Sequence, residues 1–459
     1  MNDIGALTIA KLQDAISAGR LSAVDVTGYY LDRVEASQPI LSAYTSIDTG
    51  GALAQARAID ERVARGEPVG PLAGVPVSVK DIIDVRGLAT TGCSRSALGE
   101  VPARDAEVVA RLRACDAIIL GKANCHEFAF GGPSFDLPFP PARNPWNPEY
   151  FPGGSSSGSG VSVAAGLCLA SIGTDTAGSI RTPSGHCGVV GLMPGYDRLS
   201  RHGVRPLSIT MDHVGPMARN TRDCRTVYEC LTGSDTGEGD AGIRYRRGDF
   251  SGLRFGMAAV GWGLEDRLHP EVRAAYNAAG LLVEDGGGFV EQVRLPSLEL
   301  VHAAASVTMM AEVAANHAPA VRANYDDYGT VFRSRTLAGE AVRLDDYMAA
   351  ISLRDTLYRA TIRLFDRVEF IALPVSVNPP GKLAAVDRFY FMGDPNINIL
   401  ANFLHLPAVT LPCGVSKQGL PIGMQLLGRR GSEASLLDIA EGLERRIGRW
   451  DDQRTDKVI

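Results

Sequence analysis

The chain has 459 residues, of which 45% are hydrophobic, and its 46 Lys and Arg against 52 Asp and Glu give a net charge of −6. These values are typical of a globular protein that buries a large core without disulfide or metal staples. Because a non-specific grip on nucleic acid or an anionic membrane requires a cationic surface, we expect neither as a partner.

Cysteine usage and the first residues indicate the compartment. The eight cysteines contain no C-x-x-C pair, which argues against a disulfide scaffold. The opening segment 1–5 lacks the basic start and apolar run of a signal peptide. No run of about 18 consecutive apolar residues is present, so no membrane-spanning helix is expected. The cytoplasm is the expected location.

The N-terminal third combines helices with short apolar strands. Apolar spacing and N-terminal hydroxyl or acidic residues predict helices over 8–18, 22–36, 53–65 and 105–114. β-branched or apolar runs predict strands over 75–79 and 117–120. Alternation of strands and helices indicates a sheet covered by helices on both faces.

Beyond a proline-dense loop at 138–152, the chain becomes rich in glycine and serine before it resumes this alternation. A small-residue helix is predicted over 161–166, and buried strands over 370–375 and 408–411. Since no repeat or low-complexity linker is present, we expect one domain over residues 1–459. Its parts are N-terminal helices (6–66), a core that contains the glycine- and serine-rich stretch (67–235), a helical segment (265–365) and a C-terminal α/β portion (366–445).

The stretch 153–160 reads Gly-Gly-Ser-Ser-Ser-Gly-Ser-Gly and admits several interpretations. A flexible linker would join polar segments, whereas this stretch enters an apolar helix. A phosphate cradle would need a third glycine, where Val163 stands. A G-x-S-x-G nucleophile elbow would need a buried strand before it, where prolines stand instead.

A fourth interpretation combines three separated residues. Lys80 ends an apolar β run, although a charged ammonium in such a setting is costly. Ser155 follows 75 residues later, and Ser179 closes the small-residue stretch 173–179, whose amide groups can converge on one point. A base, a relay hydroxyl, a nucleophile and oxyanion donors are the parts of an acyl-transfer site.

The same residues carry a resemblance to a known family. Segments 153–160 and 173–181 strongly resemble the amidase signature family, and Val77–Asp81 resembles its lysine segment at similar spacing. Further similar pieces lie at 144–146, 187–192, 212–216 and 419–423. The resemblance extends over about residues 5–445 and is weakest over 240–370.

The resemblance implies a single large α/β/α domain around a mixed, twisted sheet, with a Ser–cis-Ser–Lys triad. Ser179 matches the acylated nucleophile, Ser155 the bridging serine after a cis peptide bond, and Lys80 the base. Thr176, Ala177, Gly178 and the amide of Ser179 match the oxyanion loop.

Other side chains receive supporting roles or none. Like the family's equivalent loop, the segment containing Phe130 and Gly131 is expected to line the acyl pocket, with Phe130 and Phe135 as an apolar wall. Asp175 and Arg181 are expected to brace the nucleophile loop. No metal or other cofactor is expected, and the eight histidines are expected to be dispensable for the chemistry.

The sequence differs from the family at two places near the oxyanion loop. Ala177 occupies a position that is commonly glycine, which is tolerated unless the backbone there requires a positive φ. The segment 192–197 lacks the Lys and Thr usual there, which affects packing or pocket details rather than the triad.

The function expected from these residues is hydrolysis of a linear carboxamide. A free lysine has a pKa of about 10.4, so Lys80 must be buried to act as a neutral base. A stand-alone amidase acting on a small-molecule amide is favoured, because 132–136 lacks the Ser-Thr-Glu-Asn stretch usual in the alternative. That alternative is the glutamine amidohydrolase subunit of a tRNA-dependent amidotransferase, which works with partner subunits. A homo-oligomer is left open.

Overall fold

The computed structural model describes residues 4–233, 249–259, 262–264, 266–387 and 396–448. Its strands form one eleven-stranded mixed sheet in the order β1-β3-β2-β4-β6-β5-β10-β11-β9-β7-β8. The strands are β1 (Tyr44–Ile47), β2 (Pro76–Lys80), β3 (Ile118–Ala123), β4 (Ala170–Asp175), β5 (Val190–Met193), β6 (His213–Ala218), β7 (Arg254–Met257), β8 (Phe289–Gln292), β9 (Phe370–Pro374), β10 (Ala408–Val415) and β11 (Pro421–Leu427).

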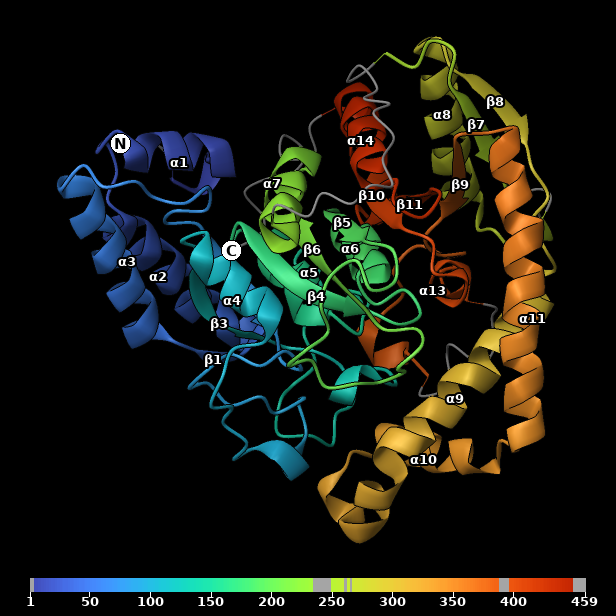
Figure 1. Cartoon of the computed structure of the whole chain (residues 1–459), viewed down its shortest axis with the longest axis horizontal. Helices are drawn as coiled ribbons and strands as arrows, with labels where there is room; N and C mark the ends of the chain where they lie inside the picture. The colour runs from blue at the N-terminus through green and yellow to red at the C-terminus, as the bar shows by residue number, and fades with distance from the viewer. Residues whose placement is uncertain (1–3, 234–248, 260–261, 265, 388–395, 449–459) are drawn as a thin grey trace.

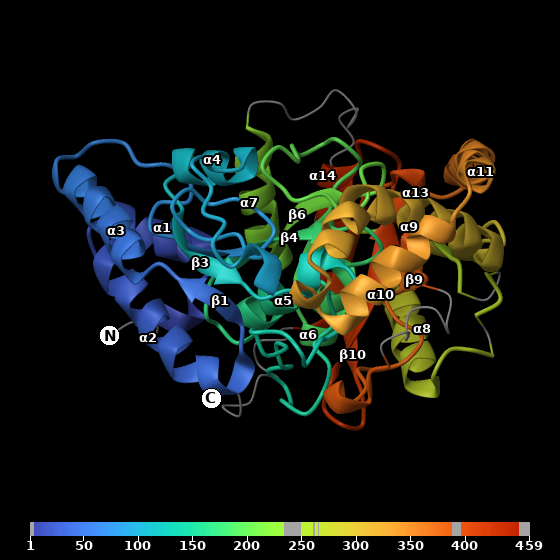
Figure 2. The ribbon, with the colours of Figure 1, turned by 90° about the horizontal axis from the view of Figure 1, so that it is seen from below.

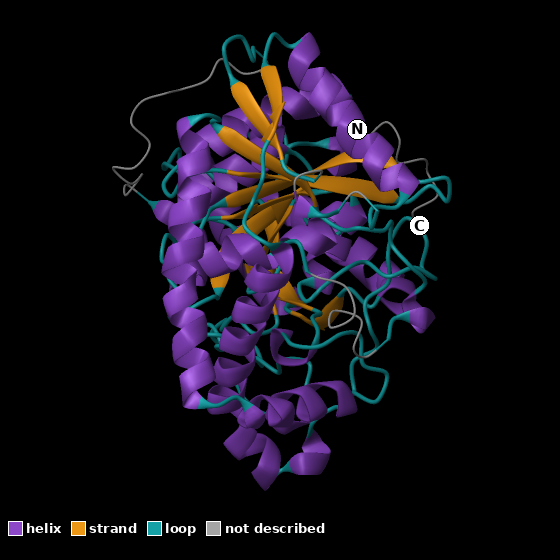
Figure 3. Cartoon of the chain, turned by 90° about the vertical axis from the view of Figure 1, so that its right-hand side faces the viewer, coloured by secondary structure: helices purple, strands orange, loops and turns teal. Residues whose placement is uncertain are grey.

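Helices cover both faces of this sheet (Figure 3). The α-helices of the described residues are α1 (Ile9–Ser17), α2 (Ala23–Leu41), α3 (Thr49–Ala64), α4 (Glu107–Ala114), α5 (Ser157–Ala164), α6 (Arg181–Cys187), α7 (Thr221–Thr232), α8 (Pro270–Asp285), α9 (Leu298–Ala323), α10 (Thr330–Ala338), α11 (Leu344–Ile362), α13 (Ile399–Leu404) and α14 (Glu433–Ile447). The expected α/β fold class is therefore confirmed. Helices α1–α3 and α9–α11 lie toward opposite ends of the molecule (Figure 1; Figure 2).

Local sequence explains where several of these elements begin and end. The side chains of Thr8 and Ser22 cap α1 and α2 by accepting the backbone N–H groups of Lys11 and Asp25. Helix α3 stops before Gly66, whose φ of 69° is in the left-handed region that favours glycine. Strand β2 is buried along its whole length, as expected for a central strand with parallel neighbours.

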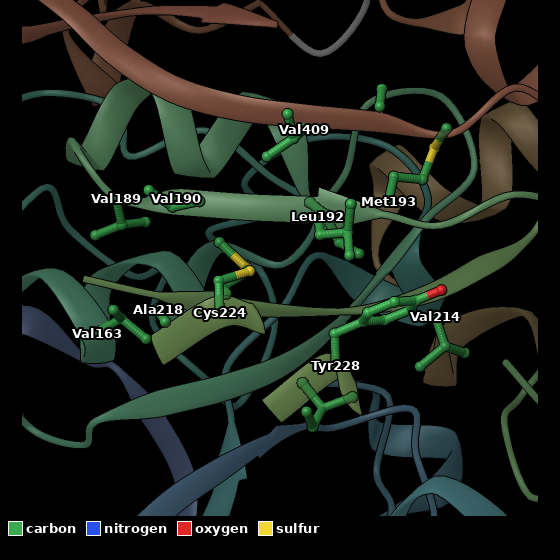
Figure 4. Close-up of a cluster of buried hydrophobic side chains, with 14 of the residues drawn as sticks. Val163, Val189, Val190, Leu192, Met193, Val214, Ala218, Cys224, Tyr228 and Val409 are labelled. Atoms are coloured by element: carbon green, nitrogen blue, oxygen red, sulfur yellow. The ribbon is translucent and has the colours of Figure 1, made fainter. Parts of the chain in front are cut away.

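The apolar core is continuous from one end of the sheet to the other. Figure 4 shows one part of it, where Leu192 of β5 and Val214 of β6 lie near Cys224 and Tyr228 of α7. All four of these side chains are buried. Such packing holds the sheet rigid, so that residues at the strand ends keep fixed relative positions.

Most of the predicted elements are present, with differences in extent. The N-terminal portion 6–66 contains strand β1 as well as helices, and the helical segment 265–365 contains the short strand β8. The predicted helix over 161–166 begins earlier, at Ser157. The division into four parts of one domain stays a prediction, and its boundary at 235 lies outside the described residues.

Helix α9 meets the length and hydropathy criteria for a membrane span, with a window of mean hydropathy 1.3. Half of that window is buried, and α9 packs against α10, α11 and α13. Buried core helices meet the same criteria, so this is weak support for a membrane span.

Candidate active site

The site lies where parallel strands end. Strands β2 and β4 are parallel neighbours, and their carboxyl ends carry Lys80 and the pair Thr174 and Asp175. In α/β sheets, ligands bind outside these carboxyl ends, where the loops that follow the strands supply the functional groups. Here β4 leads into the loop 176–180 and then α6.

Lys80 is completely buried, with two hydroxyl groups around its amine. Its Nζ lies 2.8 Å from Ser155 Oγ and 2.8 Å from Thr174 Oγ1. Burial is the main cause that lowers the pKa of Lys80 to about 8, while nearby acidic groups including Asp175 and Asp212 oppose the shift. About a tenth of such amines is neutral at pH 7, compared with fewer than one in a thousand for a free lysine.

The neighbouring Asp81 does not reach Lys80 as a counter-ion. It forms an ion pair with Lys122 of β3 at 3.1 Å, and both side chains are completely buried. Its carboxylate also accepts the hydroxyl of Thr91. Asp81 and Lys122 thus form a separate buried ion pair beside Lys80.

Ser155 and Ser179 both line one pocket of about 650 Å³, which we call the serine pocket. The peptide bond between Gly154 and Ser155 is cis, as the resemblance implies. Ser155 is buried and Ser179 is half-buried. The Ser156 N–H donates to the Ser179 carbonyl at 3.1 Å, so the two serine-bearing loops are bonded to each other.

The nucleophile loop is braced by Asp175 and Arg181, as expected. Their buried side chains form an ion pair at 3.0 Å, which with further hydrogen bonds holds the pKa of Asp175 well below its usual range, against the effect of burial. Asp175 also accepts the Gly178 and Ile180 N–H groups at 2.7 and 3.0 Å.

The hydrogen bonds to Asp175 affect which backbone amides of the loop are available to donate to an oxyanion. The Gly178 N–H already donates to Asp175, so its expected role as an oxyanion donor stays a prediction that would require this bond to be given up. The N–H groups of Thr176, Ala177 and Ser179 have no acceptor among the described residues. Ala177 does not have a positive φ, so its methyl group is accommodated. A Cβ at Gly178 would come within 2.7 Å of Asn398, and its φ is 109°.

The walls of the serine pocket agree only partly with the sequence analysis. Phe130 and Gly131 line it as expected. Phe135 does not, because its side chain is 63% exposed, and the second aromatic wall is Phe151 instead. Residues 132–136 contribute nothing to the lining.

Histidines line the serine pocket, although no pattern in the sequence places them there. His126 stacks on Phe151 with ring centroids 5.9 Å apart, and His186 meets the same ring edge-on at 6.1 Å. Burial lowers the pKa of His126 to about 3 and that of His186 to about 4. Both are therefore neutral at pH 7 and much weaker bases than Lys80. No metal-binding cluster of His, Cys, Asp or Glu occurs among the residues that the structure describes.

Comparison with known proteins shows the family of the chain. The family model described as Amidase matches residues 25–437. A glutamyl-tRNA(Gln) amidotransferase subunit of Roseiflexus castenholzii is 35% identical, with 97% of this chain and 96% of that protein covered.

Two solved structures are similar at a TM-score of 0.87. One is a crystal structure of an amidase, 32% identical over 96% of this chain and 100% of that one. The other, described in connection with a vestigial protein complex and the evolutionary origins of an s-triazine catabolic enzyme, is 30% identical over 96% of this chain and 99% of that one. The protein is thus an amide-hydrolysing α/β enzyme. It belongs to the Amidase family.

Proposed function

We propose that this enzyme hydrolyses a carboxamide C–N bond through an acyl-enzyme on Ser179, with Ser155 and Lys80 as its proton relay. The observation that carries the proposal is the buried Lys80 amine, 2.8 Å from Ser155 Oγ at a pocket that Ser179 also lines. A buried amine of lowered pKa beside a hydroxyl is suited to accept a proton at neutral pH.

The proposed reaction has two similar halves. Ser179 Oγ attacks the carbonyl carbon while its proton passes to Ser155 and the Ser155 proton passes to Lys80. Amides of the 176–179 loop other than Gly178 hold the oxyanion. The C–N bond then breaks, and the relay returns the proton to the departing nitrogen. Water attacks the acyl-enzyme by the same relay, which releases the carboxylic acid and restores Ser179.

The relatives favour the amidotransferase alternative over the stand-alone amidase expected from sequence. Several curated relatives, at 33–35% identity, are named as subunits of glutamyl-tRNA(Gln) amidotransferase. Residues 132–136, which lack the Ser-Thr-Glu-Asn stretch, do not line the serine pocket and so do not count against this alternative. We therefore propose glutamine as the first substrate to test, with partner subunits present.

Measurements of ammonia release distinguish the amidotransferase subunit from the stand-alone amidase. The purified chain is assayed with glutamine and with linear aliphatic and aromatic amides, alone and with the candidate partner subunits. Glutamine hydrolysis that appears only with the partners supports the amidotransferase reading. Turnover of other amides by the chain alone supports the stand-alone amidase and contradicts the amidotransferase proposal.

The pH dependence of kcat/KM follows from Lys80. Since burial lowers the pKa of Lys80 to about 8 and the neutral amine is the active form, kcat/KM is expected to rise about tenfold per pH unit below 8. It then levels off above pH 8. Initial rates between pH 5.5 and 9.5 measure this rise, and the stability of the enzyme is checked at each pH. If kcat/KM instead levelled off above about pH 4, a buried histidine such as His186 would be the base.

A further inference from the structure

The hydroxyl of Thr176 is tied to a buried carboxylate outside the relay. Thr176 Oγ1 donates to Asp212 Oδ1 at 2.6 Å, and both residues are buried, at 2% and 7% exposure. Thr176 is the first residue after β4 and directly precedes the half-buried Ala177. Its hydrogen bond to Asp212 therefore ties the residue that precedes Ala177 to the residue directly before β6.

The second oxygen of Asp212 holds a separate turn. Asp212 Oδ2 accepts the N–H groups of Leu207 and Ser208 at 2.8 and 3.0 Å. Leu207 itself lines the serine pocket. One carboxylate thus connects the nucleophile loop to the turn over residues 207–212, and its acceptor positions are used by hydroxyl and amide donors rather than by a cation.

A second carboxylate, from the helical segment, holds the same turn. Glu312 of α9 accepts the hydroxyl groups of Ser208 and Thr210 at 2.6 and 2.8 Å and the Thr210 N–H at 3.0 Å. Tyr347 of α11 donates to it at 3.0 Å. The contacts form a continuous series from α11 and α9, through the turn, to the loop before Ser179.

We propose that Asp212 is a positioning residue for the reaction at Ser179, and that it orients the Thr176–Ala177 peptide group toward the oxyanion. Glu312 supports Asp212 by holding the 207–212 turn, whose amide groups donate to Asp212 Oδ2. This inference rests on the proposed function. A donor that is displaced by about 1 Å costs on the order of 100-fold in rate, although the displaced group need not contact the substrate.

Threonine substitutions test the hydrogen bond without removing Asp212. Thr176→Val removes the hydroxyl and keeps the shape, and kcat is expected to fall roughly 10- to 100-fold with little change in KM. Thr176→Ser keeps the hydroxyl and is expected to keep most of the turnover. A purely structural role would lower the melting temperature of Thr176→Val without this selective loss of kcat.

Asp212→Asn completes a double-mutant cycle. Asparagine keeps one acceptor oxygen, so it cannot accept both the Thr176 hydroxyl and the turn amides as the carboxylate does. The substitution is expected to lower kcat by a similar factor, and the double variant with Thr176→Val is expected to be no worse than the more impaired single variant, because both changes act on one link. Multiplied losses, or a Thr176→Val enzyme with unchanged kcat, would overturn the inference. Should Asp212→Asn fail to fold, the threonine pair still decides.

Two controls isolate the result. Asp60 accepts the Ala23 and Val24 N–H groups at 2.6 and 3.0 Å, remote from the site, so Asp60→Asn is expected to affect stability and leave kcat unchanged. Ser179→Ala is assayed in parallel. If that variant keeps its activity, the proposed function fails. If it is inactive while Thr176→Val is unimpaired, only the positioning role of Asp212 fails.

Discussion

Ser179→Ala is expected to lower ammonia release by roughly four orders of magnitude or more, as loss of the nucleophile does in other serine hydrolases. The variant has no atom to form the acyl bond, while binding and oxyanion contacts remain. Because Ser179 is half-buried and the change removes one oxygen atom, the melting temperature is expected to stay close to that of the parent enzyme. Steady-state assays at saturating amide measure the loss.

The matched control is another serine of the same pocket. Ser306 lies on α9 and also lines the serine pocket. Ser306→Ala is expected to keep most of the turnover, because no step of the proposed relay passes through it. Equal losses in the two variants would mean that the pocket, rather than the Ser179 hydroxyl, limits the reaction. Retained activity of Ser179→Ala would refute the acyl-enzyme.

Lys80→Met is expected to reduce kcat/KM by roughly 10³- to 10⁴-fold, because methionine fills a similar volume and cannot accept a proton. The residual activity should lose the rise toward pH 8. Lys80→Arg is not expected to restore turnover, since a guanidinium stays protonated at every accessible pH. Rates measured across the pH range for the parent and both variants check these expectations.

Lys122 offers a control of the same type on the adjacent strand. It is also completely buried, but it pairs with Asp81 at 3.1 Å rather than with a serine. Lys122→Met leaves Asp81 without its partner, which costs about 3–5 kcal/mol of stability. Its folded fraction should nevertheless turn over the amide. A Lys80→Met enzyme that keeps its rate, or a Lys122→Met enzyme that folds fully and loses it, would contradict the assignment of the base.

The strands that carry the site were unevenly predictable. Strand β2 stands out in the sequence because β-branched residues surround Ser78, whereas β4 reads Ala-Ser-Ile-Gly-Thr-Asp and has no strand-like alternation. Gly173 of β4 faces Ser156, and a Cβ there would lie 2.9 Å from its hydroxyl. Close packing against α5 therefore selects small residues over strand-forming ones, and this part of the sheet was missed.

The pocket walls depended on contacts distant in sequence. Phe135 and Phe151 are equally apolar, but only Phe151 lies against His126, while Phe135 is exposed. Asp212 and Glu312, 100 residues apart, meet only at the 207–212 turn. Asp212 begins one of the family-like segments, but no local pattern assigns a role to either carboxylate, since that role depends on which donors the fold brings to it.

The amino-acid sequence by itself determined which chemical groups are present and in what order. These are an amine at Lys80, hydroxyl groups at Ser155 and Ser179, and a loop of small residues whose backbone amides can converge on an oxyanion. Only the tertiary structure decided whether the amine is protonated and which backbone N–H groups are already bonded. Burial between strands sets the protonation of Lys80, and the Gly178 N–H, one of the expected oxyanion donors, is engaged by Asp175. Protonation and donor availability depend on neighbours in space, which spacing along a chain does not specify.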